Sequence, residues 1–172
     1  MTRAGHLVRR FAGSVRPRPL ERAAADLVRD TLRPEELACW ERLGPADRAE
    51  SVATARAVVG ALGSDADPTW VAAALLHDVG KVEAGLGAIG RSAATVAAAL
   101  AGSWRARAWT GRFGRYVNHD ELGADRLRAA GARPVAASWA AVHHRRALWA
   151  GSGIPLEICE ILAAADGEAV ER

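Results

Sequence analysis

The sequence predicts an all-α fold, and three features support this: two of its composition and one of its residue pattern. Alanine and leucine outnumber the β-branched residues, and aromatic residues are few apart from six tryptophans. No segment alternates apolar and polar residues as a half-buried strand does. The chain has 172 residues, half of them hydrophobic, and is therefore long enough to bury one core. We expect a single helical domain over residues 20–172, preceded by a basic arm at 1–19.

The arm holds several arginines and no acid, and its end, Arg16-Pro17-Arg18-Pro19, breaks any helix. We expect it to be partly flexible. No apolar segment resembles the core of a signal peptide or approaches the ~20 residues of a transmembrane helix. We therefore expect a cytoplasmic protein without a transmembrane segment. The Ala-, Arg- and Gly-rich composition, with Lys81 as the one lysine, is typical of a GC-rich bacterial genome.

Helices are expected first over 20–31, 34–43 and 45–62. Proline is favoured at the first helical position and glycine just past a helix end, as Pro34 with Gly44 and Pro45 with Gly63 illustrate. Apolar residues at helical spacing within these segments are predicted to face the core. They are Leu37, Trp40, Leu43, Val52, Ala55, Val58, Val59 and Leu62.

The next segment, Asp67 to Lys81, is expected to contain a helix that is too short to span a membrane and apolar enough to be buried. Asp67 is a suitable N-cap and Pro68 a suitable first residue, and an Ala/Leu/Val run follows them. Gly80 is expected to end the helix as a residue with positive φ. His77 and Asp78 stand at the buried end, where an imidazole and a carboxylate are costly unless they are paired or hold a metal.

Three further helices carry polar residues at their ends. In the first, Asn118 is expected as N-cap, with Glu121 returning the capping bond, and Gly123 permits close packing. Pro134 opens a helix that leads to the histidine pair His143-His144. Pro155 opens the last helix, with Ile158, Ile161, Leu162 and Ala165 as its apolar stripe and Asp166 one turn after Leu162.

Residues 91–100 are expected to form an apolar helix, and the stretch from Ser103 to Arg112 then interleaves arginine with tryptophan. We favour a helix with its tryptophans inward and its arginines in water. The alternatives are an anion-binding mouth, a membrane-surface segment or a platform for stacked bases. The modest net charge of +3 does not require a nucleic-acid partner.

Cys39 and Cys159 are too few for a disulfide framework or a thiolate metal site. Both lie in apolar helical surroundings. We expect buried free thiols.

The histidines and acids that fall at helix ends occur in a characteristic order: His77-Asp78, His119, His143-His144 and Asp166. Over about residues 35–170 this order resembles the HD-domain superfamily of metal-dependent phosphohydrolases. The hallmark is the His-Asp pair in Leu75-Leu76-His77-Asp78-Val79-Gly80-Lys81. The run from Asn118 to Ala124 is similar to the His-Pro-Glu-Ile-Gly-Ala run of many HD proteins.

The resemblance implies an all-α HD-type bundle with one or two divalent ions, Mn, Fe, Mg or Zn. The implied ligands are His77, Asp78, His119, His143, His144 and Asp166, with Glu50 where the superfamily has its first ligand histidine. Glu50 has two interpretations. Its carboxylate can ligate such a metal, or it is a solvated helix residue and the site lacks one ligand.

The implied activity is hydrolysis of a phosphoester or phosphoanhydride, with a nucleotide as the expected small-molecule substrate. Asp78, Lys81 and His144 are the expected catalytic residues: Asp78 at the metals, Lys81 at the phosphoryl oxygens and His144 at the leaving oxygen. The alternative is a degenerate HD module that binds a nucleotide or a partner protein without catalysis. No nucleic-acid partner is expected, and a homodimer is left open.

Overall fold

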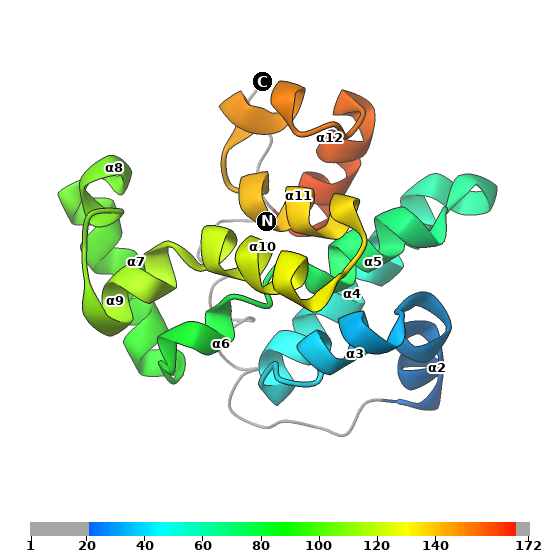
Figure 1. Ribbon diagram of the computed structural model, residues 1–172, viewed down its shortest axis with the longest axis horizontal. Coiled ribbons are helices and arrows are strands. Elements are labelled where there is room, and N and C mark those ends of the chain that lie inside the picture. The colour runs from blue at the N-terminus through cyan, green and yellow to red at the C-terminus, as the bar shows by residue number, and fades with distance from the viewer. Residues whose placement is uncertain (1–20, 168–172) are drawn as a thin grey trace, which may run out of the picture.

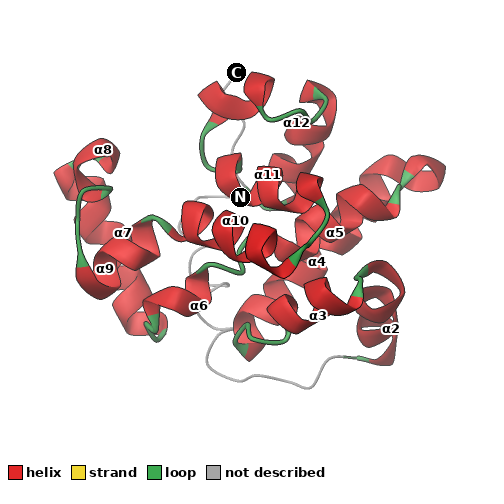
Figure 2. Cartoon of the chain, viewed as in Figure 1, coloured by secondary structure: helices red, strands yellow, loops and turns green. Residues whose placement is uncertain are grey.

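The structure is a computed structural model that describes residues 21–167, so the arm predicted for 1–19 lies outside the described residues. Within this range the regular structure is helical and contains no strand, which confirms the all-α prediction (Figures 1 and 2). The helices are α2 (Arg22–Thr31), α3 (Pro34–Trp40), α4 (Pro45–Leu62), α5 (Pro68–Leu76), α6 (Lys81–Ala84), α7 (Ala88–Ala101), α8 (Ser103–Ala106), α9 (Gly111–Val117), α10 (His119–Ala130), α11 (Pro134–Val142) and α12 (Leu156–Ala165), with short 3-10 helices at Gly63–Asp65 and Arg146–Gly151.

Proline and glycine set several helix ends as predicted. Pro45 and Leu62 bound α4, and Gly63 follows with a φ of 56°. Asp67 caps α5 by accepting a hydrogen bond of 2.6 Å from the Thr69 N–H. The prediction for 34–43 is wrong at its end, because α3 stops at Trp40 and the chain turns towards α4.

The core is built around α5, which contacts α2, α3, α4, α11 and α12 (Figure 1). All of its residues from Val71 to Leu76 are buried, so the helix is apolar on every side instead of amphipathic. Most of the predicted core residues pack around it, and Cys39 and Cys159 are buried free thiols as predicted. Val59 is an exception with 36% exposure, because Val58 already occupies the core-facing position of that turn.

The prediction for Gly80 is wrong both in the helix end and in its physical reason, because α5 already ends at Leu76 and residues 77–80 form a turn. Its φ is −71°, so the position does not need a left-handed backbone. Gly80 is instead required by a close approach, because a Cβ there would lie 1.9 Å from the carbonyl oxygen of His119 and 2.6 Å from the N atom of Gly123. The absence of a side chain lets the turn after α5 rest directly on the first turn of α10.

Substitution of Gly80 by alanine is expected to destabilise the protein by about 1–3 kcal/mol, because the new methyl group meets backbone that cannot rotate away. Gly60, within α4, is the matched control, since a Cβ there meets no atom within 4 Å. Gly60→Ala should stabilise the protein by about 0.5–1 kcal/mol through its higher helix propensity. Urea unfolding of both variants measures these changes, and equal stabilities would contradict the packing argument.

Helices α7, α8 and α9 form a unit at one side of the bundle (left in Figure 1). Helix α7 packs on α8 and α9, and α9 connects the unit to α6 and α10.

No single helix within residues 21–167 is long and apolar enough to cross a membrane. The segments Pro68–Ala84 and Ile89–Ala101 meet the length and composition criteria only together, with a bend of 95° between them.

Candidate metal centre

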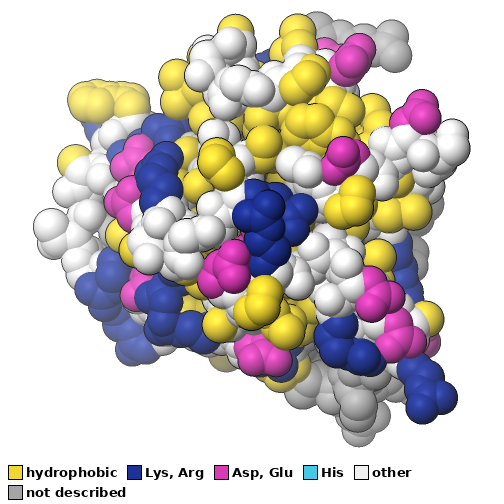
Figure 3. Space-filling model, turned by 45° about the vertical axis from the view of Figure 1, so that its right-hand side comes forward, with side chains coloured by type: hydrophobic (Ala, Val, Ile, Leu, Met, Phe, Trp, Pro, Cys, Tyr) yellow, Lys and Arg dark blue, Asp and Glu magenta, His cyan; other side chains and the backbone are white. Residues whose placement is uncertain are grey.

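The candidate site lies where α5, α10, α11 and α12 bring their polar ends together. His77 is the C-cap of α5 and Asp78 follows it, and both side chains are buried. His119 begins α10, His143 is the C-cap of α11, and Asp166 is the C-cap of α12. On the face that Figure 3 shows, no histidine side chain reaches the surface. His144, next to His143, is the one exposed histidine of the group.

Three of these imidazoles share one local arrangement. Nδ1 of His77, His119 and His143 lies 2.7–2.8 Å from the carbonyl oxygen three residues earlier, which belongs to the last turn of the preceding helix. A carbonyl only accepts hydrogen bonds, so each Nδ1 carries a proton and donates it. In the neutral ring, Nε2 then holds a lone pair that is free for a metal ion.

The Nε2 atoms converge on the carboxylate of Asp78. Its Oδ1 lies 3.2 Å from Nε2 of His119 and 3.8 Å from Nε2 of His143. Its Oδ2 lies 3.2 Å from Nε2 of His77, which is also 3.3 Å from Oδ1 of Asp166. Asp78 therefore joins two groups of possible ligands, one with His77 and Asp166 and the other with the remaining histidines.

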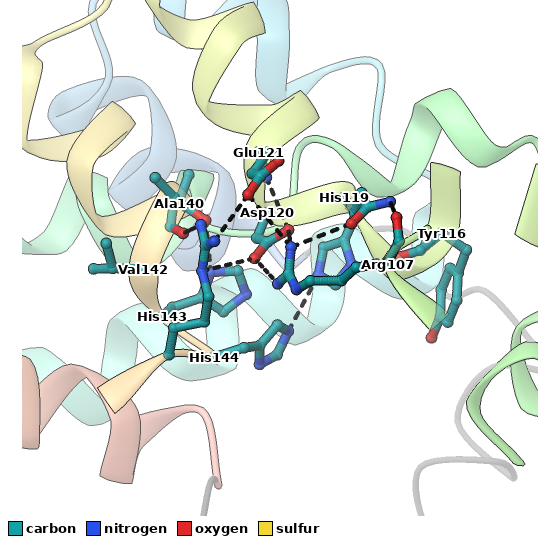
Figure 4. Close-up of polar contacts among 12 residues, drawn as sticks. Arg107, Tyr116, His119, Asp120, Glu121, Ala140, Val142, His143 and His144 are labelled. Carbon is teal, nitrogen blue, oxygen red and sulfur yellow. Dashed lines mark hydrogen bonds and ion pairs between the residues drawn. The ribbon is translucent and has the colours of Figure 1, made fainter. Parts of the chain in front are cut away.

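The second group includes His144, whose Nε2 lies 3.2 Å from that of His119 (Figure 4). One ligand atom each from Asp78, His119, His143 and His144 can be chosen so that all four lie within 4.8 Å of one another. This spacing suits a single divalent ion with nitrogen and oxygen ligands.

Several of the converging atoms are buried without a hydrogen-bond partner. They are Nε2 of His77 and His143, Oδ1 of Asp78 and Oδ1 of Asp166. Among these four atoms, Nε2 of His77 lies 3.3 Å from Oδ1 of Asp166, and Nε2 of His143 lies 3.8 Å from Oδ1 of Asp78. A buried polar atom without a partner is costly, and a cation in each of the two groups would give these atoms a partner. The residues present therefore fit a divalent metal ion.

The charges around the site favour the protonation states that metal ligands need, namely ionised carboxylates and neutral imidazoles. Burial raises the pKa of the Asp78 carboxyl, but Lys81 and His77 outweigh it and hold that pKa well below its usual value. Burial likewise raises the pKa of Asp166, and His77 reverses the shift. Burial lowers the pKa of His143, and His144 lowers it further, so this imidazole is neutral. Two carboxylates and a neutral imidazole are ready to bind a cation.

His77 differs from His143. Burial lowers its pKa, but the charges of Asp78 and Asp166 hold the pKa of His77 well above its usual value. A positive charge is therefore strongly favoured between these two carboxylates, whether a proton or a metal ion supplies it.

Lys81 and Glu50 stand at the edge of the site. The Lys81 ammonium forms an ion pair with Oδ2 of Asp78, and its side chain is 12% exposed. Burial lowers the pKa of Lys81, but Asp78 and then Glu50 raise it above its usual value. Glu50, half-buried on α4, thus lies within electrostatic reach of Lys81. It is not among the four residues whose ligand atoms converge.

A buried network that the sequence did not indicate supports the histidines from outside (Figure 4). Asp120 is fully buried and forms ion pairs with Arg107 and, at 3.4 Å, with Arg145. Arg145 also pairs with Glu121 at 2.8 Å. Asp120 follows His119 and Arg145 follows His144, so the network fixes both histidines relative to each other. The one sequence feature that could have pointed to Asp120 and Arg145 is that each directly follows a predicted ligand.

This network also corrects two predictions. The capping box is wrong, because the Asn118 side chain bonds to Arg107 and Glu121 pairs with arginines. The interpretation of residues 103–112 holds for Arg105 and Arg112, which are exposed, and for the half-buried Trp109, but it is wrong for Trp104 and Arg107. Trp104 is 74% exposed, whereas the Arg107 side chain is half-buried beside Asp120. The buried carboxylate, which needs a counter-charge, determines which residue turns inward.

The fold and the site together define an all-α domain with a His/Asp cluster that can bind metal. The family model of the HD domain matches residues 41–169, and the chain belongs to this family. HD domains bind divalent metals and are typically metal-dependent phosphohydrolases. No curated protein and no solved structure matches the chain.

Proposed function

We propose that this chain is a metal-dependent phosphohydrolase that acts on a small phosphoester or phosphoanhydride, with a nucleotide as the expected substrate. The observation that carries the proposal is the convergence of histidine Nε2 atoms with fixed tautomers on the Asp78 carboxylate, among buried atoms that lack hydrogen-bond partners. A solely structural cluster would pair these atoms with one another or with backbone groups.

The roles of the residues follow from their positions. Asp78 joins the two groups of ligands, His77 and Asp166 belong to the first, and His119, His143 and His144 to the second. When bound, divalent cations supply Lewis-acid polarisation of a phosphoryl oxygen and lower the pKa of a water molecule. We assign Lys81, protonated and partly exposed, to the phosphoryl oxygens of the substrate.

His144 is suited to a proton-transfer role. It is exposed, unlike His77, His119 and His143, and its ring packs against that of His143 with centroids 3.9 Å apart. From the rim of the site it can reach both a metal ion and the leaving oxygen of a substrate. We propose that His144 donates a proton to that oxygen when it does not serve as a ligand.

A second candidate function is a binding module without catalysis. The ion pair between Lys81 and Asp78 favours it, because the ammonium already neutralises one carboxylate oxygen that a metal would use. Glu50, beside Lys81, adds a carboxylate where the family's first ligand histidine is expected. In this case a nucleotide would raise the melting temperature of the protein without being hydrolysed.

The metal content of the chain separates the two functions. We expect about one or two divalent ions per chain when untagged protein, purified without chelator, is measured by plasma mass spectrometry. This protein should release phosphate from a panel of nucleotides and other phosphoesters, and chelation should abolish the release until Mn²⁺ or Fe²⁺ is restored. Absence of bound metal after incubation with an excess of these ions would rule out the hydrolase and favour the binding module.

The variant Glu50→Gln tests whether Glu50 is a ligand. If the carboxylate binds metal, the amide should lower metal affinity by about 10–100-fold, as the loss of an important contact around a metal does. Unchanged affinity would instead place Glu50 outside the coordination shell, where its charge acts on Lys81.

A further inference from the structure

The outer face of α7 carries an exposed apolar stripe that the proposed function does not use. Ile89, Val96 and Leu100 are 81%, 58% and 84% exposed, and Trp104, on the following helix α8, is 74% exposed. The spacing of seven and four residues places the three aliphatic side chains on one face of α7. Small residues such as Ala94, fully buried, face the rest of the unit instead. A contiguous apolar surface of this kind usually marks a contact site.

The segment that carries the stripe is also uniformly basic. Residues 85–117 contain five arginines and no aspartate or glutamate. Two of them are neutralised, Arg91 by Asp47 and Arg107 by Asp120. The other three are exposed and pair with no carboxylate among the described residues: Arg105, Arg112 and Arg115.

These three arginines flank the two ends of the stripe. The guanidinium of Arg105 lies over the ring of Trp104, 5.3 Å from its centroid. Arg112 donates to the carbonyl oxygens of Ala84 and Gly85, just before α7, and Arg115 donates to that of Glu83. Backbone carbonyls hold these side chains in place without cancelling their charge. On the left of Figure 3, where this unit lies, basic side chains occur beside hydrophobic ones.

The charge decides which partner fits. The arm at 1–19 is itself basic, and a second copy of the unit would bring unpaired arginines face to face, so both are disfavoured. An anionic partner is required, and the aliphatic stripe matches acyl chains better than stacked bases, which prefer aromatic platforms. We propose that the outer face of α7 and α8 binds peripherally to a bilayer that contains anionic phospholipid.

In this arrangement the stripe inserts at the level of the headgroups and acyl chains while the flanking arginines bind lipid phosphates. Trp104 suits the interface because its ring is apolar and its N–H is polar. Each arginine near an anionic surface strengthens binding about fivefold. The proposal is independent of the metal site and of the hydrolase function.

Vesicle sedimentation of the full chain tests the proposal. We expect the protein to sediment with vesicles of phosphatidylglycerol and phosphatidylcholine in equal parts, and to stay in solution with phosphatidylcholine alone. Binding at about 0.1 M salt should be mostly lost at about 1 M, where charges are strongly screened. Sedimentation with both lipids alike, or with neither, would overturn the proposal.

Two variants locate the surface. Leu100→Ser should weaken binding about tenfold through lost apolar area, and Arg105→Glu at least fivefold through lost charge attraction. Both side chains are exposed, so folding is expected to be unaffected. Leu156→Ser is the matched control, since Leu156 is 54% exposed on α12, away from α7 in Figure 1, and its substitution should leave binding unchanged.

Two other outcomes would point to different partners and overturn the proposal. One is tighter binding to single-stranded DNA than to the anionic vesicles, with Leu100→Ser without effect on either. The other is a stable dimer in analytical ultracentrifugation that Leu100→Ser dissociates, which would mean that a second copy covers the stripe.

Discussion

The Asp78→Asn variant is expected to lose its bound metal and its phosphohydrolase activity together. Asp78 is the residue that contacts both groups of ligands, with His77 on one side and His119 on the other. An amide has no negative charge to balance a divalent ion. Its N–H group could also donate to a histidine Nε2 lone pair, which would then no longer be free for the metal. Plasma mass spectrometry should show metal near background, and phosphate release should fall to the level of the chelated protein.

Two comparisons separate this effect from unfolding. The Asp78→Asn substitution leaves the largely buried Lys81 ammonium without its partner, so the melting temperature should be recorded for every variant. His144→Gln changes an exposed residue that we propose as a ligand, and it should fold normally while losing metal and activity in part. Asp125→Asn, at an exposed surface carboxylate, should behave as the wild type. Full activity in Asp78→Asn with a lowered metal content would contradict the proposed mechanism.

The Glu36→Gln variant is expected to destabilise the fold by about 3–5 kcal/mol, the range measured when one partner of a buried ion pair is removed. Glu36 is fully buried and accepts four hydrogen bonds. Oε1 accepts from the N–H and Nε of Arg133 at 2.9 and 2.8 Å, and Oε2 accepts from Nη2 of Arg133 and the N–H of Arg33 at 2.9 and 3.0 Å. A glutamine has one oxygen, and its amide N–H groups would face donors.

The same arginine ties further helices together. Arg133 also donates to the carbonyl oxygens of Pro68 and Thr31, each at 2.9 Å, so the ion pair links the ends of α2, α3, α5 and α11. Loss of the Glu36–Arg133 ion pair in Glu36→Gln should therefore lower the free energy of unfolding of the whole domain, as measured by urea unfolding. Asp26→Asn, which removes one partner of an exposed pair with Arg29, should change the stability by less than about 1 kcal/mol.

The pH dependence of Glu36→Gln has a defined sign. Burial raises the pKa of Glu36, but its hydrogen bonds with Arg133 outweigh this and lower the pKa below its usual value. Its contribution to stability is therefore complete above the unfolded pKa and is lost as the pH falls through the folded pKa. The stability difference between wild type and variant should narrow below about pH 4. A difference that stays constant down to about pH 2 would contradict the assigned role of the carboxylate.

The sequence alone predicted the helical class and most helix starts, and its resemblance to the HD family named most of the residues that the structure brings together at the candidate site. These predictions rest on interactions within a few residues of the chain: the cap of Asp67 on Thr69, the prolines at helix starts and the apolar run of α5. The placement of His77-Asp78, His143 and Asp166 at helix ends follows from the same local signals. A side chain at the end of a buried helix points out of the bundle's apolar interior, where polar groups from other helix ends can meet it.

What the sequence could not determine depends on packing between distant segments. Glu36 and Arg133 are 97 positions apart, and nothing local marks them as partners. Gly80 is a glycine because α10 lies against it, not because of its own backbone angles. Arg107 turned inward, and Trp104 outward, because Asp120 was buried beside it. Local bonds determine where each helix begins and ends, whereas the pairing of buried charges and the faces left exposed are decided only when the helices pack.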